Sequence, residues 1–288
     1  MLVESAFSIL PEIIAGAGFQ KVAKEANAVS SFSYALLNTL HSKNVLEPLQ
    51  RIQQEKLYAT KILPLPALHQ NRICDIYLNY GGSKIGTQAL AAYGWRYVNY
   101  IEAKFLKNYK STKTGQDTNA QKNSAELIAD LIRLICLVPE PELVKKPNQA
   151  KTSSARYLLV LANAKPSVFI TKYLVELLSF FEKPFSVGQI TIDLGSSKAK
   201  KSLAGKVGTN FDRLKIECNR LTVQSHYPMG ITGKGACWML LIRIDAAKVS
   251  MTYNNNVHTY EIKEDRTLAE GAQDDYTKIR DFVANNIK

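Results

Sequence analysis

The chain has 288 residues, 46% of them hydrophobic, and a formal net charge of +12 at pH 7. This length and apolar content are ample for a folded core, which excludes a disordered basic tail. No apolar run reaches the roughly 18 residues that a membrane-spanning helix needs. The apolar N-terminus is interrupted by Glu4, Pro11 and Glu12 and lacks the basic leader of a secretory signal. We interpret it as part of the fold.

Four cysteines and four histidines are scattered along the chain. No two cysteines form a Cys-x-x-Cys pair, and no two histidines share the spacing of metal ligands. The sequence therefore predicts neither a disulfide framework nor a metal site, and it names no cofactor. Reduced thiols favour a cytoplasmic protein without a membrane partner.

The first elements of the chain are predicted to be mainly helical. Apolar residues recur at three- and four-residue spacing over residues 20–60, before Pro64 and Pro66 break the pattern. Residues 73–80 have the composition of a strand, which ends at a Gly-Gly turn. The N-terminal half, residues 1–145, is thus expected to be mainly helical.

Residues 84–109 are predicted to form one long helix. Its aromatic and aliphatic residues give an apolar stripe, and Arg96, Lys104, Lys107 and Lys110 give a basic one. Aromatic side chains interleaved with cations could stack bases and neutralise phosphates. An amphipathic helix with aromatic core contacts and solvated lysines would show the same pattern, so both interpretations stay open.

A further helix is predicted over residues 124–138, with Ser124 as its N-cap, and a linker or loop over residues 145–154. The second half, residues 155–288, is richer in strand signals, and residues 214–223 are ambiguous between helix and strand. Its predicted elements are strands at 155–164, 188–194 and 236–245, helices at 172–181 and 276–287, and a hairpin over 248–263 turning at Asn254–Asn256. Strands interspersed with helices indicate an α+β fold, which we take as one domain over residues 1–288.

The most informative stretch is the basic, glycine-punctuated segment over residues 198–215. Its cations suit a phosphate backbone, because lysines neutralise phosphates without reading sequence. A solvated basic surface is the plainer interpretation, but the segment agrees with the charge of the whole chain. The predicted contacts in this segment are Lys198, Lys200, Lys201, Lys206 and Arg213.

The glycine-rich segment over residues 227–238 is not a phosphate-binding P-loop, because Ala236 stands where that motif needs Ser or Thr. It fits either a loop whose backbone approaches a bound strand or a hairpin turn.

A metal-dependent nuclease is the main alternative, because such enzymes pair acidic residues with a lysine. Two Glu-x-Lys triplets occur, Glu102-Ala103-Lys104 and Glu261-Ile262-Lys263. The first falls on a predicted helix, whereas that type of active site places the triplet on a strand. The second falls on a predicted strand, with Asp245 as a possible acidic partner.

Four segments, taken in order, resemble the RNA-binding backbone subunit of type I-F (Csy-type) CRISPR Cascade complexes. They are Ala92-Tyr93 with residues 103–108, residues 158–177, the Lys206–Asn210 run, and Tyr227-Pro228 with the glycine loop up to Ala236. The tryptophan of that family's helix signature is absent, and the first 70 residues show no match.

The resemblance implies an RRM-like antiparallel sheet palm with inserted helices and hairpin projections. It also implies a non-catalytic protein of antiviral defence that self-associates along CRISPR RNA (crRNA), with other Cascade subunits, and presents the RNA to target DNA. The residues it carries over as RNA contacts are Arg96, Lys104, Lys107, Asn108, Lys206, Asn210, Gly233 and Lys234. A viral nucleocapsid-like protein that coats RNA would have the same composition, so the sequence leaves this alternative open beside the nuclease.

Overall fold

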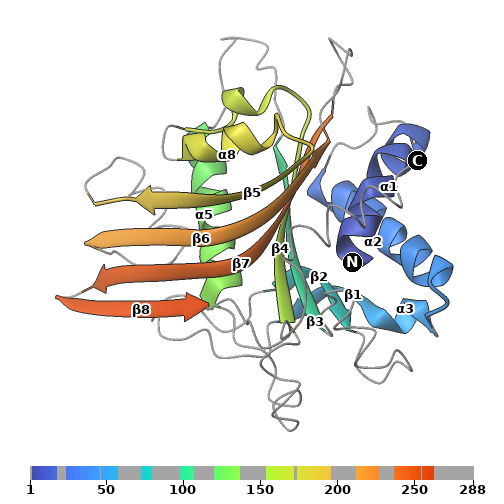
Figure 1. The fold of residues 1–288 in the computed structure, drawn as a ribbon, viewed down its shortest axis with the longest axis horizontal. Coiled ribbons are helices and arrows are strands. Elements are labelled where there is room, and N and C mark those ends of the chain that lie inside the picture. Colours follow the sequence, from blue (N-terminus) through green and yellow to red (C-terminus); the bar gives the residue numbers. More distant parts are fainter. Residues whose placement is uncertain are drawn as a thin grey trace, which may run out of the picture.

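The protein is described here from a computed structural model. It describes residues 2–17, 24–45, 47–57, 73–79, 98–106, 120–136, 154–171, 174–195, 212–226, 237–253 and 255–262. Over these ranges the fold is α+β, with helices on a large mixed sheet (Figure 1). The helices are α1 (Leu2–Ala17), α2 (Glu25–Ser42), α3 (Pro48–Arg51), α5 (Ala120–Cys136), the 3-10 turn η2 (Pro166–Val168) and α8 (Val175–Phe180). The strands are β1 (Ile52–Leu57), β2 (Ile73–Asn79), β3 (Val98–Leu106), β4 (Ser154–Ala162), β5 (Phe185–Asp193), β6 (Arg213–His226), β7 (Trp238–Tyr253) and β8 (Asn256–Ile262).

The strands form one sheet in the order β1-β2-β3-β4-β7-β6-β5, with β8 paired to β7. Every pairing is antiparallel except that of β3 with β4, which is parallel and runs from Val98 opposite Ser154 to Leu106 opposite Ala162. A parallel pair needs a crossover connection, and the segment between β3 and β4 contains α5. Among the described elements, helix α2 is followed along the chain by the short helix α3, the antiparallel strands β1, β2 and β3, helix α5 and strand β4.

Strand β7 changes partner along one of its edges. Its first part, up to Arg243, pairs with β4, and its second part, from Ala247, pairs with β8. Strand β6 pairs with β7 along almost its whole length on the other edge. Figure 1 shows the result, in which the long strands β5–β8 extend away from the β1–β4 part of the sheet.

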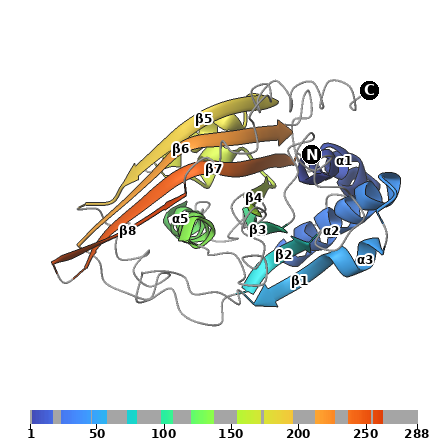
Figure 2. The same ribbon diagram turned by 60° about the horizontal axis from the view of Figure 1, so that its bottom comes forward.

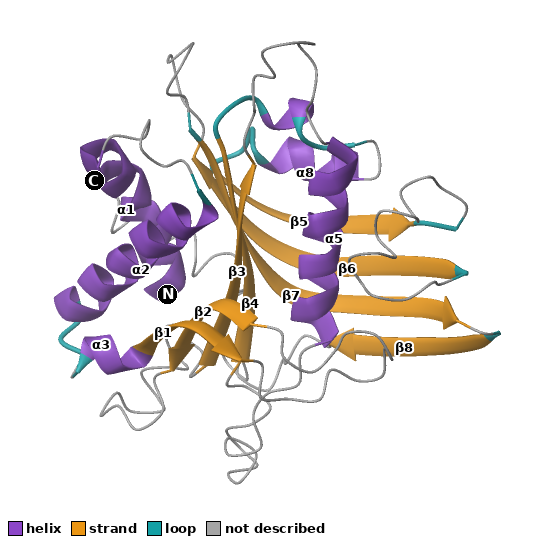
Figure 3. Ribbon diagram, turned by 180° about the vertical axis from the view of Figure 1, so that it is seen from behind, coloured by secondary structure: helices purple, strands orange, loops and turns teal. Residues whose placement is uncertain are grey.

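Helices cover both faces of the sheet and bury a separate apolar core on each. One core joins α1 and α2 to β2, β3, β4 and the start of β7. The other core joins α5 and α8 to the opposite face of β3–β7. Figure 2 shows α5 end-on between the long strands and β3–β4, and Figure 3 shows it crossing strands β5–β8.

A buried polar network fastens α1 to the sheet. Arg243 on β7 donates from Nε to Asp245 Oδ1 at 2.6 Å and lies 3.5 Å from Glu4 Oε1. Glu4 also accepts a hydrogen bond from the Tyr157 hydroxyl at 3.0 Å, and Asp245 accepts one from Thr222 Oγ1 at 2.6 Å. Burial and the nearby Glu4 carboxylate raise the pKa of Tyr157 well above its ordinary value. None of the described helices is both long enough and apolar enough to cross a membrane.

The predicted strands are largely confirmed. Those at 73–80, 155–164 and 188–194 correspond to β2, β4 and β5, and the hairpin over 248–263 is formed by β7 and β8. The ambiguous residues 214–223 lie within strand β6. The N-terminal segment is confirmed as part of the fold, because α1 packs its apolar face into a core. The predicted helix at 276–287 lies outside the described residues.

The predicted helix over residues 84–109 is wrong where the structure describes it, because residues 98–106 form strand β3. Helices cover both faces of the sheet here, so most β3 side chains on either side are buried. A strand buried on both faces reads as a nearly continuous apolar run and loses its two-residue alternation. In such a run, some apolar residues fall at three- and four-residue spacing by coincidence, and this spacing led to the helix prediction. The helix predicted over residues 20–60 similarly gives way to strand β1 at Ile52.

The helix predicted over residues 124–138 is confirmed as α5, but it begins at Ala120 rather than at Ser124. Ser124 lies inside the helix and is buried. Its Oγ accepts a hydrogen bond from the backbone N–H of Thr171 at 3.0 Å. The Ser124 hydroxyl thus accepts a hydrogen bond from the backbone of a neighbouring loop instead of capping its own helix. The helix predicted over 172–181 is confirmed in part, as α8 over Val175–Phe180.

Candidate active site at the end of the β2–β3 ladder

The candidate site lies where strand β2 separates from β3. The ladder between these two strands ends at the pairing of Ile76 with Ile101, and β3 continues to Leu106. Beyond that point two carboxylates accept hydrogen bonds from backbone N–H groups on this edge of β3. The N–H of Ala103 donates to Asp75 Oδ2 at 2.7 Å, and that of Phe105 donates to Glu25 Oε2 at 3.3 Å. An unpaired strand edge is thereby satisfied by acidic side chains instead of by a further strand.

Side-chain alternation along β3 places two charged residues on the α5 side of the sheet. Ile101 and Ala103 belong to the core beneath α1 and α2. Successive side chains of a strand point to opposite faces, so Glu102 and Lys104 point toward α5. Glu102 is buried, and the Lys104 side chain is only 15% exposed. The strand thus presents a carboxylate and an ammonium group two residues apart in a shielded position.

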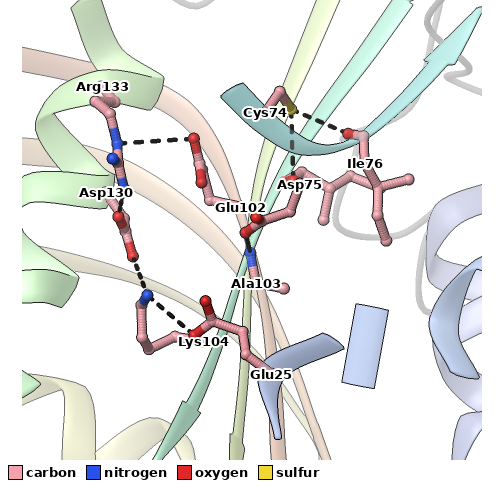
Figure 4. Close-up of polar contacts among 10 residues, drawn as sticks. Glu25, Cys74, Asp75, Ile76, Glu102, Ala103, Lys104, Asp130 and Arg133 are labelled. Atoms are coloured by element: carbon pink, nitrogen blue, oxygen red, sulfur yellow. Dashed lines mark hydrogen bonds and ion pairs between the residues drawn. The ribbon is translucent and has the colours of Figure 1, made fainter. Parts of the chain in front are cut away.

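Lys104 lies between carboxylates from two helices (Figure 4). Its Nζ is 3.0 Å from Glu25 Oε2 at the start of α2 and 3.7 Å from Asp130 Oδ2 on α5. One turn along α5, Arg133 Nε lies 3.7 Å from Glu102 Oε1, and Arg133 also pairs with Asp130. The ion pairs therefore alternate in sign from Glu25 through Lys104, Asp130 and Arg133 to Glu102.

Asp75 is the carboxyl group whose ionisation this arrangement perturbs. Burial raises the pKa of Asp75, and the neighbouring Glu25 carboxylate raises it further. The Ala103 N–H, the Lys104 ammonium and a hydrogen bond with the Glu102 carboxyl oppose the rise without cancelling it. A perturbed carboxyl beside a second carboxyl and a lysine is typical of functional sites.

The donor set fits a divalent cation that shares its coordination with a substrate. Within the described ranges, no three Asp, Glu, His or Cys side chains converge closely enough to hold a metal by themselves. Mg²⁺ is commonly held by only one or two carboxylates together with substrate phosphates. Asp75 and Glu102 are neighbours in this site, and the interaction with Glu102 lowers the pKa of Asp75. A divalent ion could be held by these two carboxylates.

Lys104 is the predicted RNA contact whose position in the fold differs most clearly from the expected one. We expected it on the exposed basic face of a helix, but it lies on β3 and its charge is neutralised by Glu25 and Asp130. Arg213, at the start of β6, is 61% exposed and pairs with Asp193 at 2.5 Å. The other predicted contacts lie outside the described residues: Arg96, Lys107, Asn108, Lys198, Lys200, Lys201, Lys206, Asn210, Gly233 and Lys234.

The second Glu-x-Lys triplet has a different environment from the one expected. Asp245 is held by Arg243 and Thr222 in the network beneath α1. Glu261 is exposed on β8, where it pairs in register with Lys248, and Lys263 lies outside the described residues. The acidic residue proposed for this triplet therefore already has buried partners, whereas the first triplet has Asp75 beside it.

Sequence reasoning found Glu102 and Lys104 as a triplet but missed Asp75, Glu25, Asp130 and Arg133. A charged pair inside the apolar run at residues 97–106 was the available signal, because charges seldom occur in a buried strand without partners. The acidic partners are distant along the chain and meet only through the strand order. Comparison with protein families, with curated proteins and with solved structures finds no match to this chain.

Proposed function

We propose that this protein is a metal-dependent nuclease whose active site contains Asp75, Glu102 and Lys104. The observation that carries the proposal is that the Glu102-Ala103-Lys104 triplet lies on a strand, with Asp75 donated by the neighbouring antiparallel strand. The expected helix was the reason to set this triplet aside. With β3 in its place, the local geometry agrees with the acid-plus-lysine type of nuclease site.

Two carboxylates would hold the metal ion, namely Asp75 and Glu102. When bound, a divalent ion supplies Lewis acidity toward a phosphoryl oxygen and lowers the pKa of a coordinated water. The raised pKa of Asp75 reflects the cost of keeping a carboxylate half-buried and beside the Glu25 carboxylate, and a cation would relieve it. This proposal departs from the sequence-based expectation of a non-catalytic protein without a metal.

Lys104 would contact the phosphate group that is cleaved. A lysine ammonium provides a compact positive charge that can stabilise the extra negative charge on phosphate in the transition state. Glu25 holds this ammonium from the more open side of the site, since its side chain is 40% exposed. Access for a substrate is therefore expected from the Glu25 side rather than through the buried Asp130.

The charge of the chain suits a polyanionic substrate. A net charge of +12 favours binding to a phosphate backbone independently of its sequence. This property is shared by the RNA-coating interpretations, so charge alone does not separate them. The crRNA-binding backbone subunit with its RRM-like palm, and the nucleocapsid-like protein, stay predictions, and the two described residues assigned to RNA contact both lie in ion pairs.

The test is cleavage of duplex DNA, single-stranded DNA and RNA by purified protein with Mg²⁺ or Mn²⁺, and with EDTA in their place. We expect divalent-dependent cleavage of at least one substrate. Asp75→Asn, Glu102→Gln and Lys104→Met should each slow it by roughly a hundredfold or more, the scale of losing a charge-stabilising group in an active site.

The matched controls come from the second triplet. Asp245→Asn and Glu261→Gln should leave cleavage unchanged, since neither carboxylate belongs to the proposed site. Absence of cleavage with every substrate and metal would reject the nuclease, and defined-length RNA co-purifying with such an inactive protein would instead favour the crRNA-binding subunit. Cleavage that survives Asp75→Asn but is lost in Glu261→Gln would move the active site to β8.

A further inference from the structure

Helix α5 presents an unusual pair of charged residues to the sheet. Asp130 and Arg133 are three positions apart, so they lie on the same face of the helix. The Asp130 side chain is 2% exposed and that of Arg133 is 17% exposed. Their neighbours on α5 belong to the apolar core: Leu127, Ile128, Leu131, Ile132, Leu134 and Ile135. Because burying two charges is costly even when they are paired, apolar residues here would serve stability at least as well.

Each member of this pair reaches a different residue of the Glu102-Ala103-Lys104 triplet. Asp130 Oδ2 lies 3.7 Å from Lys104 Nζ, and Arg133 Nε lies 3.7 Å from Glu102 Oε1. The Arg133 Nη2 and Asp130 Oδ1 atoms form an ion pair with each other. The two helix residues therefore face two strand residues of opposite charge: Asp130 faces Lys104, and Arg133 faces Glu102.

We propose that Asp130 and Arg133 are positioning residues, Asp130 for the Lys104 ammonium and Arg133 for the Glu102 carboxylate. This inference rests on the nuclease function proposed above and adds residues that contact neither metal nor substrate. Partners of this kind fix the orientation of the groups that act directly, and their loss commonly costs 10–100-fold in metal affinity or activity. The two residues should have different effects, because they hold groups with different roles.

The contacts predict which kinetic quantity each residue controls. Without the Asp130 carboxylate, Glu25 is the ion-pair partner that Lys104 keeps among the described residues, so the saturated cleavage rate should fall. Arg133 contacts Asp130 through Nη2 and Glu102 through Nε, and a single lysine ammonium cannot reproduce both contacts. Replacement by lysine keeps the charge and so isolates the loss of position, which should weaken metal binding at Glu102.

The experiment compares full-length Asp130→Asn and Arg133→Lys with the wild type in single-turnover cleavage over a Mn²⁺ titration. Mn²⁺ binding to metal-free protein is measured separately by calorimetry. For Asp130→Asn we expect a saturated rate about 10–100-fold lower, with the half-saturating Mn²⁺ concentration within about threefold of wild type. For Arg133→Lys we expect that concentration to rise about tenfold, with the saturated rate within about threefold.

Controls on the same helix separate positioning from stability. Glu126→Gln removes a carboxylate one turn before Asp130, and Ile132→Val trims a buried side chain between the pair; both should keep wild-type kinetics and metal binding. If Asp130→Asn does not fold, Asp130→Glu keeps the charge and shifts the carboxylate, and it should still lower the saturated rate selectively.

Identical changes in both variants, or none, in an active wild type would overturn the positioning roles while leaving the nuclease intact. A wild type that neither cleaves nor binds Mn²⁺ would overturn both proposals.

Discussion

The backbone N–H of Ala103 donates to the Asp75 carboxylate at 2.7 Å, at the point where the β2–β3 ladder ends. The backbone hydrogen bonds between β2 and β3 end here, and the Asp75 side chain on β2 makes one further hydrogen bond to the backbone of β3. The separation of the two strands beyond this bond leaves room at the edge of β3 for Glu25, and it brings Asp75 to Glu102.

Asp75→Asn should stabilise the folded protein at neutral pH. The folded-state pKa of Asp75 is raised, so the folded protein binds the proton more tightly than the unfolded chain, and ionised Asp75 opposes folding above that raised pKa. Asparagine removes this cost and can still accept the Ala103 N–H. Urea unfolding should show the gain at pH 7 and its disappearance as the pH falls below the ordinary pKa of 3.8.

Asp193→Asn is the control with the opposite sign. A hydrogen bond from the Arg213 guanidinium lowers the pKa of Asp193, so its contribution to stability is present above the ordinary value and is lost as the pH falls through the lowered one. The variant should therefore be slightly less stable at neutral pH, and only slightly because this pair is exposed. Equal effects of the two substitutions would contradict the assigned environments.

The pKa of Asp75 should respond in opposite directions to its two charged neighbours. Glu25→Gln removes a carboxylate that raises this pKa and should lower it, whereas Lys104→Met removes a cation that lowers it and should raise it. Carboxyl carbon shifts of Asp75, followed by NMR across the acid range, give the pKa in each variant. A shift of the same sign in both would mean that one of the two groups does not face Asp75.

Lys104→Glu should destabilise the protein strongly. The substitution places a third carboxylate between Glu25 and Asp130 and leaves Asp130 buried without a cation from β3. Breaking a buried pair typically costs about 3–5 kcal/mol. Chemical denaturation measures this against Lys165→Glu, an exposed site at which a change within about 0.5 kcal/mol is expected. A comparably mild effect at Lys104 would return this residue to the surface, where the sequence analysis placed it.

Arg243→Met should loosen helix α1. The Arg243 side chain is 7% exposed and is the cation that Glu4 and Asp245 share, so its loss leaves two carboxylates near each other beneath the helix. We expect a loss of about 3–5 kcal/mol in the free energy of unfolding. Hydrogen exchange should show faster opening of residues 2–17, while Arg213→Met, on the exposed pair, should leave their exchange unchanged.

The fold could be predicted where a strand shows two-residue alternation of apolar and polar residues or ends at a recognisable turn. Residues 188–194 have one face toward solvent, so β5 keeps its alternation, and the Asn-rich turn identifies the β7–β8 hairpin. Strand β3 has helices on both sides, and nothing local distinguishes it from a buried helix. That single misassignment also hid the site, since Glu102 and Lys104 lie on one side of a strand but would be about 200° apart around a helix of 3.6 residues per turn.

The remaining members of the site depend on strand order, which a single sequence does not contain. Asp75 meets Glu102 because β2 and β3 are antiparallel neighbours, and Asp130 meets Lys104 because α5 packs back over β3 before β4. Sequence reasoning had grounds to expect a lysine-acid combination but no grounds to join residues so far apart. Only residues 212–215 of the basic segment over residues 198–215 belong to the described part of the chain, and only Cys237 and Trp238 of the glycine-rich segment over residues 227–238 do.

The change of partner along β7 has a consequence for synthesis of the protein on the ribosome. A nascent chain that has reached Ala162 already contains Asp75, the triplet, α5 and β4. The second edge of β4 pairs with residues 238–243 of β7, and among the described residues it has no other strand partner on that side, so this edge lacks its partner until that stretch has been translated. An open edge on a strand whose side chains are almost all buried in the finished protein is a template for aggregation. Products truncated between β4 and β7 should therefore need chaperones to remain soluble.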